Sequence, residues 1–292
     1  MPTPVIEKTV GDLTVVGYSL AGEETTVALP ELNVCFDAGR APREIIPIDT
    51  LCVTHGHMDH AAGIPYYLSQ RSFIGTAPGT VVIHRQLVPH VETLMACWGR
   101  IEGHASPGRI IGVTDGDETP LRRNVVLRAF TVRHGAYALG FSVIERRHKL
   151  KSEYADRSGP QLVELKKQGI AIENTVEVPL VAYVGDTADG PHFDLDHVRN
   201  ARLLIMECTF FDSDHVVRAR AGKHIHVRDL RGILPRLRNP HILLTHVTRR
   251  TDIRAAKRIL QNHVEPVDHE RITFLMDRPP RKRDRTPGEN GA

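Results

Sequence analysis

A histidine-rich loop that directly follows a buried strand is the feature that most restricts how this chain can fold. Residues 50–54 form a short apolar run, and His55-Gly-His57-Met-Asp59-His60 follows it without a gap. Three imidazoles and a carboxylate within six positions are too crowded to surround one tetrahedral zinc ion. In an extended loop alternate side chains share a side, which pairs His55 with His57 and leaves Asp59 and His60 for a second ion. The loop therefore predicts a binuclear metal site at a sheet edge.

Each ion needs ligands from elsewhere in the chain. Three candidates share one position, shortly after a predicted strand: His134, Asp186 and His246. Asp186 has two oxygens and could bridge both ions. Because imidazoles and carboxylates converge at strand ends, we interpret this set as a metal site and not as unrelated core histidines.

Hydrophobic periodicity predicts two kinds of element around these loops. The predicted strands are 13–18, 25–29, 32–36, 50–54, 125–132, 138–144, 178–184, 201–206 and 241–245. The predicted helices are 61–70, interrupted by Pro65, then 89–101, 226–237 and 252–262, and the charged stretch 146–167 is expected to be partly helical. Strands covered by helices indicate an α/β fold with a sheet-on-sheet core. We expect a single domain over 1–277 and a basic disordered tail over 278–292.

The composition agrees with a globular protein. Of 292 residues, 41% are hydrophobic, which is enough for a substantial core. No apolar run reaches roughly 18 residues, and residues 1–8 lack a basic segment followed by an apolar one, so no membrane span and no secretory signal is expected. The 4 cysteines lie far apart and form no C-x-x-C pair, which favours reduced thiols in a cytoplasmic protein.

The charge is nearly balanced. Lys and Arg total 38 against 35 Asp and Glu, and the surplus lies in the tail from Arg278 onward. A nucleic-acid footprint must therefore be local. The candidates are Arg281-Lys282-Arg283 in the tail and, in the charged stretch, Lys149, Lys151, Lys166 and Lys167. A solvated face is the favoured explanation for the lysines, and a solubilising tail explains residues 281–283 as well as RNA binding does.

Several motifs together carry a resemblance to a known family. His55-x-His57-x-Asp59-His60, with His134, Gly185-Asp186-Thr187 and Thr245-His246, resembles the metallo-β-lactamase superfamily. Met206-Glu207-Cys-Thr-Phe210 resembles the E-[AS]-T-F segment of ribonuclease Z, the tRNA 3′-processing endonuclease. Gly222-Lys-His224-Ile-His226 resembles the segment that supplies its catalytic histidine, and 244–250 resembles its H-F-S-x-R-Y motif. The short, plant-type form is the most similar.

The resemblance implies an αββα four-layer sandwich and a zinc-dependent phosphodiesterase. It places one zinc on His55, His57 and His134, a second on Asp59, His60 and His246, and Asp186 between them; Mn2+ or Fe2+ suits the same ligands. A hydroxide held between the two ions would attack the phosphorus, with Asp59 as an acceptor for its proton. His224, oriented by Glu207, would protonate the leaving 3′-oxygen. Thr248 and Arg250 would lie near the phosphate.

The resemblance also implies precursor tRNA as the substrate and a homodimer as the assembly. Two departures accompany it. The third motif reads His246-Val-Thr-Arg-Arg-Thr251, which lacks two aromatic residues, and the interval 140–185 is short and lacks the Gly-Pro-rich protruding arm with which many relatives grip tRNA. His226 could serve the site or simply begin a helix.

Two other functions use the same residues. A binuclear hydrolase of a small molecule, such as a cyclic nucleotide, a thioester or a lactone, would fit the neutral body, but it would not need the pair of Glu207 and His224. A non-catalytic binding protein on the same scaffold is disfavoured because every expected ligand position is filled.

Overall fold

Two seven-stranded sheets lie face to face in the computed structural model, which describes residues 5–277. The first sheet has the order β1 (Ile6–Val10), β2 (Leu13–Leu20), β3 (Glu24–Leu29), β4 (Val34–Phe36), β5 (Thr50–Cys52), β6 (Gly79–His84) and β7 (Gly108–Val113). The second has the order β14 (Ile272–Phe274), β13 (His241–Thr245), β12 (Leu203–Glu207), β11 (Glu173–Tyr183), β10 (Leu139–Leu150), β9 (Val125–Thr131) and β8 (Glu118–Arg122). In each sheet four strands pair antiparallel and the remaining pairs are parallel.

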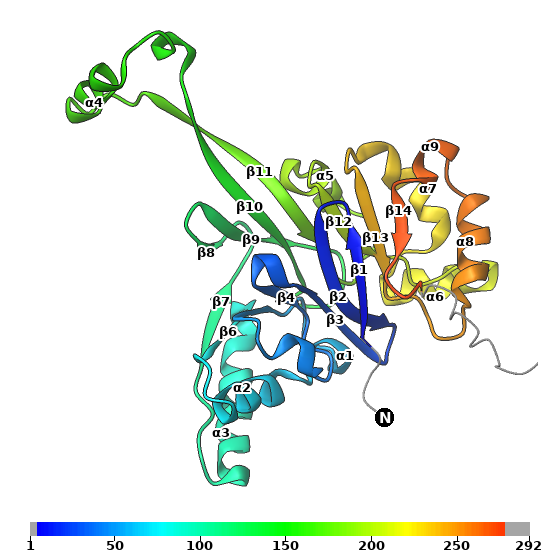
Figure 1. Ribbon diagram of the computed structural model, residues 1–292. Helices are drawn as coiled ribbons and strands as arrows, with labels where there is room; N and C mark the ends of the chain where they lie inside the picture. Colours follow the sequence, from blue (N-terminus) through cyan, green and yellow to red (C-terminus); the bar gives the residue numbers. More distant parts are fainter. Residues whose placement is uncertain (1–4, 278–292) are drawn as a thin grey trace, which may run out of the picture.

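Helices cover the outer faces of both sheets (Figure 1). The helices beside the first sheet are α1 (Met58–Ala61), α2 (Ile64–Phe73) and α3 (Val88–Glu102). The others are α4 (Gly159–Lys167), α5 (Asp196–Arg199), α6 (Val216–Gly222), α7 (Leu230–Ile233), α8 (Ile253–Gln261) and α9 (Pro266–His269). None of the helices within residues 5–277 is long and apolar enough to cross a membrane.

The core lies between the sheets because apolar side chains alternate inward along strands of both. One buried cluster unites Val27 and Phe36 of the first sheet with Phe141, Val181 and Ile205 of the second. The Phe36 and Tyr183 rings stack with centroids 4.8 Å apart, directly beneath the histidine loop. Two further clusters lie under the outer helices. The predicted α/β sandwich of four layers is confirmed.

Every predicted strand has a counterpart, and three of the four predicted helices do. Pro65 lies in the first turn of α2, which begins at Ile64, and does not interrupt the helix, since a proline in the first turn removes no intrahelical hydrogen bond. The predicted helix 226–237 is instead three short turns, which are Val227–Asp229, α7 and Leu234–Arg236. Pro235 has no N–H to continue the ladder of hydrogen bonds. The predicted tail, 278–292, lies outside the described residues.

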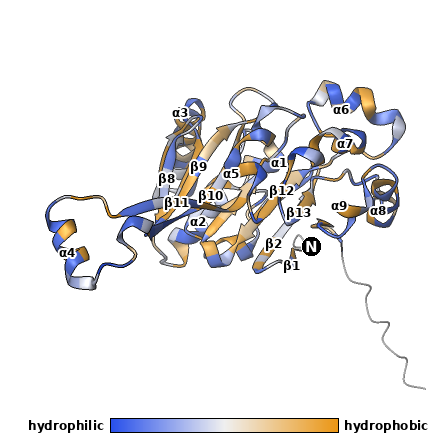
Figure 2. Ribbon diagram, turned by 90° about the horizontal axis from the view of Figure 1, so that it is seen from above, coloured by the Kyte–Doolittle hydropathy of each residue, from blue (hydrophilic) through white to orange (hydrophobic). Residues whose placement is uncertain are grey.

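The expectation that interval 140–185 lacks a protruding arm is wrong. Figure 1 shows β10 and β11 extending beyond the body and carrying α4 at their tip. The first six residues of β10 are buried, but its last four are exposed, and β11 mirrors this change. Figure 2 shows the same strands becoming hydrophilic toward α4. The arm, residues 146–177, is formed by strand pairing, so it does not need a Gly-Pro-rich sequence.

Candidate active site

The predicted ligands meet because the strands that precede them end at one edge. β5 delivers the histidine loop from the first sheet, while β11, β12 and β13 deliver Asp186, Glu207 and His246 from the second. Gly185 makes the approach of the two loops feasible: its φ is +57°, and a Cβ there would lie 2.8 Å from Thr54 Cγ2. A pocket of about 370 Å³ opens over the cluster.

The first ligand group contains the three histidines that were predicted to share an ion. His55 Nε2 lies 2.9 Å from His57 Nδ1, and His134 Nε2 lies 3.4 Å from the same His57 atom. Both His55 Nε2 and His134 Nε2 lie 3.9 Å from Asp186 Oδ2. These four side chains could hold one metal ion.

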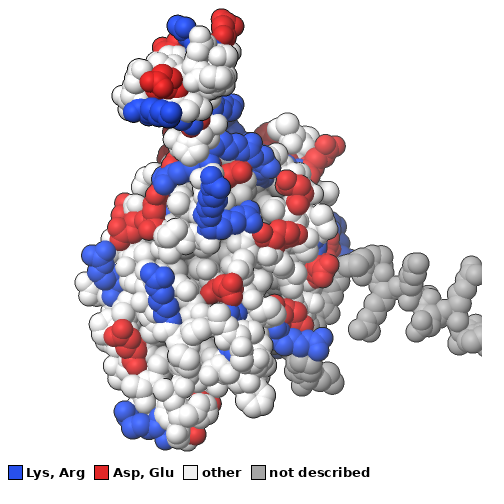
Figure 3. All heavy atoms as spheres, turned by 60° about the vertical axis from the view of Figure 1, so that its left-hand side comes forward, with Lys and Arg blue, Asp and Glu red and all other residues white. Residues whose placement is uncertain are grey.

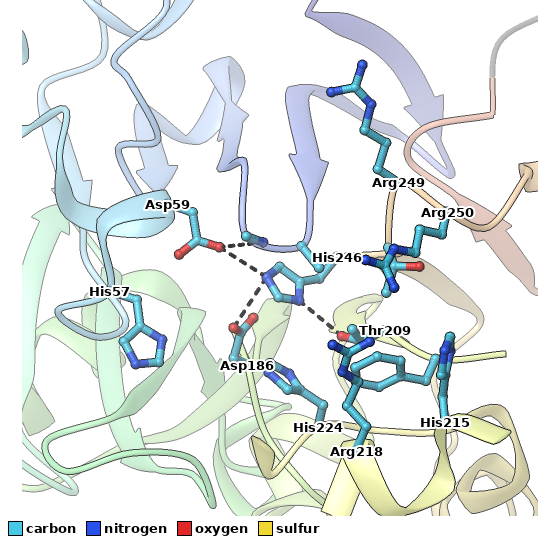
Figure 4. A pocket seen from close by; sticks show the side chains of 14 residues that line it. His57, Asp59, Asp186, Thr209, His215, Arg218, His224, His246, Arg249 and Arg250 are labelled. Atoms are coloured by element: carbon cyan, nitrogen blue, oxygen red, sulfur yellow. Dashed lines mark hydrogen bonds and ion pairs between the residues drawn. The ribbon is translucent and has the colours of Figure 1, made fainter. Parts of the chain in front are cut away.

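The second group contains Asp59, His60 and His246. Asp59 Oδ2 lies 3.6 Å from His60 Nε2 and 3.5 Å from His246 Nε2, and the two imidazole nitrogens are 3.4 Å apart. Asp186 Oδ2 lies 3.3 Å from each of these nitrogens. One oxygen of Asp186 therefore faces both groups, and Figure 4 shows this carboxylate beside His246 at the floor of the pocket.

The outer hydrogen bonds of the histidines test whether the cluster suits a cation. His134 Nδ1 faces the carbonyl oxygen of Lys223 at 3.3 Å, and His60 Nδ1 faces Asp37 Oδ2 at 2.8 Å. A carbonyl or a carboxylate can only accept, so each Nδ1 carries the proton. The Nε2 atoms of both rings then present lone pairs to the centre, as metal-ligating histidines do.

Threonine hydroxyls fix the other two rings in the same way. Thr54 Oγ1 donates to Asp37 at 2.9 Å and therefore accepts from His55 Nδ1, 3.0 Å away. Thr209 Oγ1 donates to Glu207 Oε2 and therefore accepts from His246 Nδ1 at 3.0 Å. With their Nε2 atoms unprotonated, these four imidazoles direct lone pairs toward one centre. This donor set fits a divalent cation, because nitrogen lone pairs and carboxylates 3 to 4 Å apart otherwise repel.

The charge states of Asp186 and His55 agree with metal ligation, whereas, against the effect of burial, Asp186 and Asp37 raise the pKa of His60, whose proton a metal ion would have to displace. Burial would raise the pKa of Asp186, but the neighbouring His246 and His60 hold the pKa well below its ordinary range, so the group stays a carboxylate. Burial, with the nearby His60, lowers the pKa of His55 to about 2 and keeps that imidazole neutral. Ionised carboxylate and neutral imidazole are the forms that bind metals.

His224 and Glu207 form a pair beside the metal ligands. His224 Nδ1 donates to Glu207 Oε1 at 2.8 Å, which leaves Nε2 for the pocket that His224 lines. Glu207 is fully buried and also accepts from Thr187 N at 2.8 Å and Ile225 N at 3.1 Å. Burial disfavours the charged imidazole, but Glu207 outweighs it and raises the pKa of His224 to about 9. A protonated His224 can deliver a proton at neutral pH.

Thr248 and Arg250, predicted to lie near the phosphate, line the same pocket. Thr248 N donates to Thr209 O at 3.3 Å, which ties this loop to the one that carries Glu207. The neighbouring Arg249 also lines the pocket, but its guanidinium pairs with Glu23 at 3.0 Å.

Other residues singled out in the sequence lie away from the pocket. His226 is buried, its Nε2 donates to Asp212 O at 2.9 Å, and its Nδ1 accepts from Arg228 N at 3.2 Å, so it begins a helical turn. The four lysines lie on the arm, where Lys166 pairs with Glu173 at 2.8 Å. These residues have no contact with the metal ligands.

Sequence reasoning missed the residues that hold the ligands in place. Asp37, fully buried, accepts from Thr54, His60 and the Tyr183 hydroxyl, the last at 2.8 Å. Its signal was a carboxylate at the end of an apolar strand. Thr209 and, on another wall of the pocket, His215 and Arg218 were also missed. Thr209 lies in the segment that resembles E-[AS]-T-F, which was its signal, whereas no spacing in the sequence distinguishes His215 and Arg218 from ordinary polar residues.

Comparisons with known proteins agree with this geometry. Residues 28–247 match the family model described as a Beta-lactamase superfamily domain. The protein named tRNase Z TRZ1 from Arabidopsis thaliana is 32% identical over 243 residues, which covers 82% of this chain and 86% of that protein.

Two solved structures share the fold. The metallo-beta-lactamase fold protein YhfI from Bacillus subtilis superposes with a TM-score of 0.60 at 13% identity, covering 88% of this chain and 92% of that one. The short form of human tRNase Z superposes with a TM-score of 0.54 at 16% identity, covering 94% and 91%. Sequence and fold together lead to one conclusion: this chain belongs to the tRNase Z family of the metallo-β-lactamase superfamily.

Proposed function

We propose that this protein is a zinc-dependent endonuclease that cuts precursor tRNA next to the discriminator base and leaves a 3′-hydroxyl. The observation that carries the proposal is the convergence of seven metal-type ligands, four of which line one pocket, beside the hydrogen-bonded pair of His224 and Glu207. The relationship to proteins named tRNase Z supports the same substrate.

The proposed ligand assignment follows the two groups. His55, His57 and His134 hold one ion, Asp59, His60 and His246 hold the other, and Asp186 bridges them. Zinc suits the imidazole-rich set, and Mn2+ or Fe2+ are the alternatives. Two such ions would supply a hydroxide nucleophile at neutral pH and offset the negative charge of the phosphodiester.

The remaining roles fall to the side chains around the ligands. Asp59, whose Oδ2 accepts from Gly22 N at 2.9 Å, lies at the open edge of the cluster and is assigned to accept the proton of the attacking water. His224 protonates the leaving 3′-oxygen, and Glu207 keeps its ring oriented and charged. Thr248 and Arg250 hydrogen-bond the non-bridging oxygens of the phosphate.

The arm is the structural feature that favours tRNA over a small molecule. It extends well beyond the body of the molecule, and a small substrate would have no use for it (Figure 1). Figure 3 shows basic side chains gathered where the arm leaves the body. Arg128 and Arg146 there are engaged with Glu118 and Glu177, whereas Lys149 and Lys167 form no ion pair within residues 5–277. Unpaired lysines can contact RNA phosphates.

We further propose a homodimer formed through the apolar face of α3, which we define as Leu94, Trp98 and Ile101 of α3 together with Met58 of α1. These side chains are exposed by 43%, 41%, 70% and 78%. Residues 94, 98 and 101 recur at helical spacing and so share one side of α3. Met58 and Leu94 also line an apolar surface pocket beside the histidine loop. Exposed apolar side chains that share one helix side are typical of an interface between protein chains.

The proposal also includes a cellular compartment and the bounds of the domain. Cys97 is an exposed free thiol, and Cys35, Cys52 and Cys208 are buried without a disulfide, which supports a reducing compartment such as the cytoplasm. Residues 1–277 are assigned to one hydrolase domain, because residues of both sheets share one core and one site.

The test is cleavage of a 3′-extended precursor tRNA by the zinc-loaded protein, alongside hydrolysis of bis(p-nitrophenyl) phosphate. We expect a single cut beside the discriminator base, and we expect His224→Ala to retain zinc but lose most of that cleavage. Hydrolysis of the small ester with intact precursor tRNA would instead favour a small-molecule hydrolase. Full cleavage by His224→Ala would show that the proton comes from another group.

A further inference from the structure

One wall of the pocket carries side chains that the roles above leave unused. His215 and Arg218 line the pocket together with Phe210. They are three positions apart on one helical turn, so they share a face. His215 packs its ring against Phe210 with centroids 5.5 Å apart, and Figure 4 shows Arg218 and His215 on the side of the cavity opposite His57 and Asp59.

The arginines of the pocket differ in how they are paired. Arg249 is engaged by Glu23 and points away from the cavity in Figure 4. Arg250 is assigned to the phosphate that is cut. Arg218 is exposed and forms no ion pair or hydrogen bond with any residue that the structure describes. An unpaired guanidinium beside a cluster of metal ligands can bind an anion. Its planar set of N–H donors matches the oxygens of a phosphate group.

Arg218 is also fixed relative to His224. It lies on α6, and the carbonyl of the next residue, Ala219, accepts a hydrogen bond from His224 N at 2.9 Å. Ala219 is buried, which anchors this end of the helix. The backbone that carries Arg218 is therefore held close to the backbone that carries His224.

The position of His224 indicates which side of the cut RNA strand lies against this wall of the pocket. His224 protonates the 3′-oxygen of the nucleotide upstream of the cut, so the upstream strand must leave the centre on the side of His224. Arg218 belongs to the same wall. It thus meets the chain before the scissile phosphate and not after it.

We propose that Arg218, backed by His215 and Phe210, forms a subsite for the RNA phosphate one nucleotide upstream of the scissile phosphate. The inference rests on the proposed endonuclease function and adds to it the register in which the substrate lies. The subsite positions the strand and takes no part in bond cleavage. It should therefore act on KM more than on kcat.

The experiment combines a side-chain change with a change in the substrate. Arg218→Gln is compared with Arg220→Gln, a control on the same helix that does not line the pocket. Each protein is assayed on precursor tRNA and on the same RNA with one uncharged methylphosphonate at the upstream position. We expect Arg218→Gln to raise KM about tenfold on normal RNA, as for loss of one charge-assisted hydrogen bond. On the methylphosphonate RNA, Arg218→Gln should raise KM by less than about twofold, since the side-chain change and the substrate change remove the same interaction.

Three results would overturn the subsite. Equal kinetics for Arg218→Gln and Arg220→Gln would remove any role of Arg218 in binding. A tenfold effect that persists on the methylphosphonate RNA would assign Arg218 to another part of the substrate. A loss on bis(p-nitrophenyl) phosphate as large as on RNA would place it at the scissile phosphate. Failure of the endonuclease proposal itself is separate, because the unmodified protein would then leave precursor tRNA uncut.

Discussion

His224 Nδ1 donates a hydrogen bond to Glu207 Oε1 at 2.8 Å. This bond links the proposed proton donor to a carboxylate that accepts three further hydrogen bonds. Thr209 extends the link to the metal ligand His246. The proton donor and the metal centre are therefore parts of one hydrogen-bonded unit, and they should respond together to changes within it.

The first prediction concerns the pKa of His224 in the metal-free protein. Burial favours the neutral ring, but Glu207 raises the pKa to about 9. Glu207→Gln should lower this pKa by about one unit or more, because the carboxylate charge is lost while the size is kept. An NMR titration of the His224 ring proton measures it. An unchanged pKa would show that Glu207 does not control the charge of His224.

The same shift has a consequence for stability. A pKa raised from about 6.5 to about 9 means that the folded state binds the proton more tightly than the unfolded state. This stabilisation is complete below about pH 6.5 and disappears as the pH rises through about 9. The difference in unfolding free energy between wild type and Glu207→Gln should therefore be larger at pH 6 than at pH 10, by urea denaturation of the metal-free proteins.

The second prediction concerns Thr209. Thr209→Val keeps the shape but removes the hydroxyl that orients His246 and Glu207. We expect zinc affinity to fall about tenfold, as for loss of an outer partner of a ligand, and Thr209→Ser to restore it. Competition with a chromophoric chelator measures the affinity. Equal affinity of Thr209→Val and wild type would contradict a role of the hydroxyl in holding the ligand.

The third prediction concerns Asp186, whose Oδ2 faces both ligand groups. Asp186→Ala should reduce the bound zinc from two equivalents to well below one, because each ion loses a ligand and two neighbouring cations lose a shared negative charge. Elemental analysis after dialysis measures this. Asp196→Ala, at an exposed surface ion pair with Arg199, is the control and should keep the wild-type zinc content. Two equivalents in Asp186→Ala would refute bridging.

The fourth prediction concerns the arm. Residues 151–172 can be replaced by Asn-Gly, because Leu150 and Glu173 are the last paired residues and a two-residue turn closes such a pair. We expect the KM for precursor tRNA to rise at least about tenfold, with a much smaller effect on bis(p-nitrophenyl) phosphate. Equal losses on both substrates would show that the arm supports the fold of the site and does not bind RNA.

The fifth prediction concerns the apolar face of α3. Trp98→Glu should convert a dimer into a monomer, since it buries a charge in the proposed interface. Sedimentation velocity measures the mass, and Val267→Glu, at an 81% exposed position on α9, is the control. A monomeric wild type would contradict the dimer, and a dimeric Trp98→Glu would move the interface elsewhere.

The parts of the fold that could be predicted are those that produce a local hydrophobic pattern in the sequence. Strands such as 178–184 and 241–245 are continuous apolar runs, and Asp252 caps the helix that follows it. Strands β1, β6, β7, β8 and β14 were missed. In β7 and β8 the reason is that exposed and polar residues interrupt the alternation. The arm was missed because its strands leave the core, where hydrophobic alternation no longer marks a strand.

The sequence by itself determined which atoms are available as ligands, because His55, His57, Asp59 and His60 are held together by the length of one short loop. It could not determine the hydrogen-bond partners that orient them. Asp37 lies 23 positions from His60, and Thr209 lies 37 from His246. Only the pairing of β4 with β5 and of β12 with β13 brings these groups to about 3 Å, because a hydrogen bond depends on distance in space and not on separation along the chain.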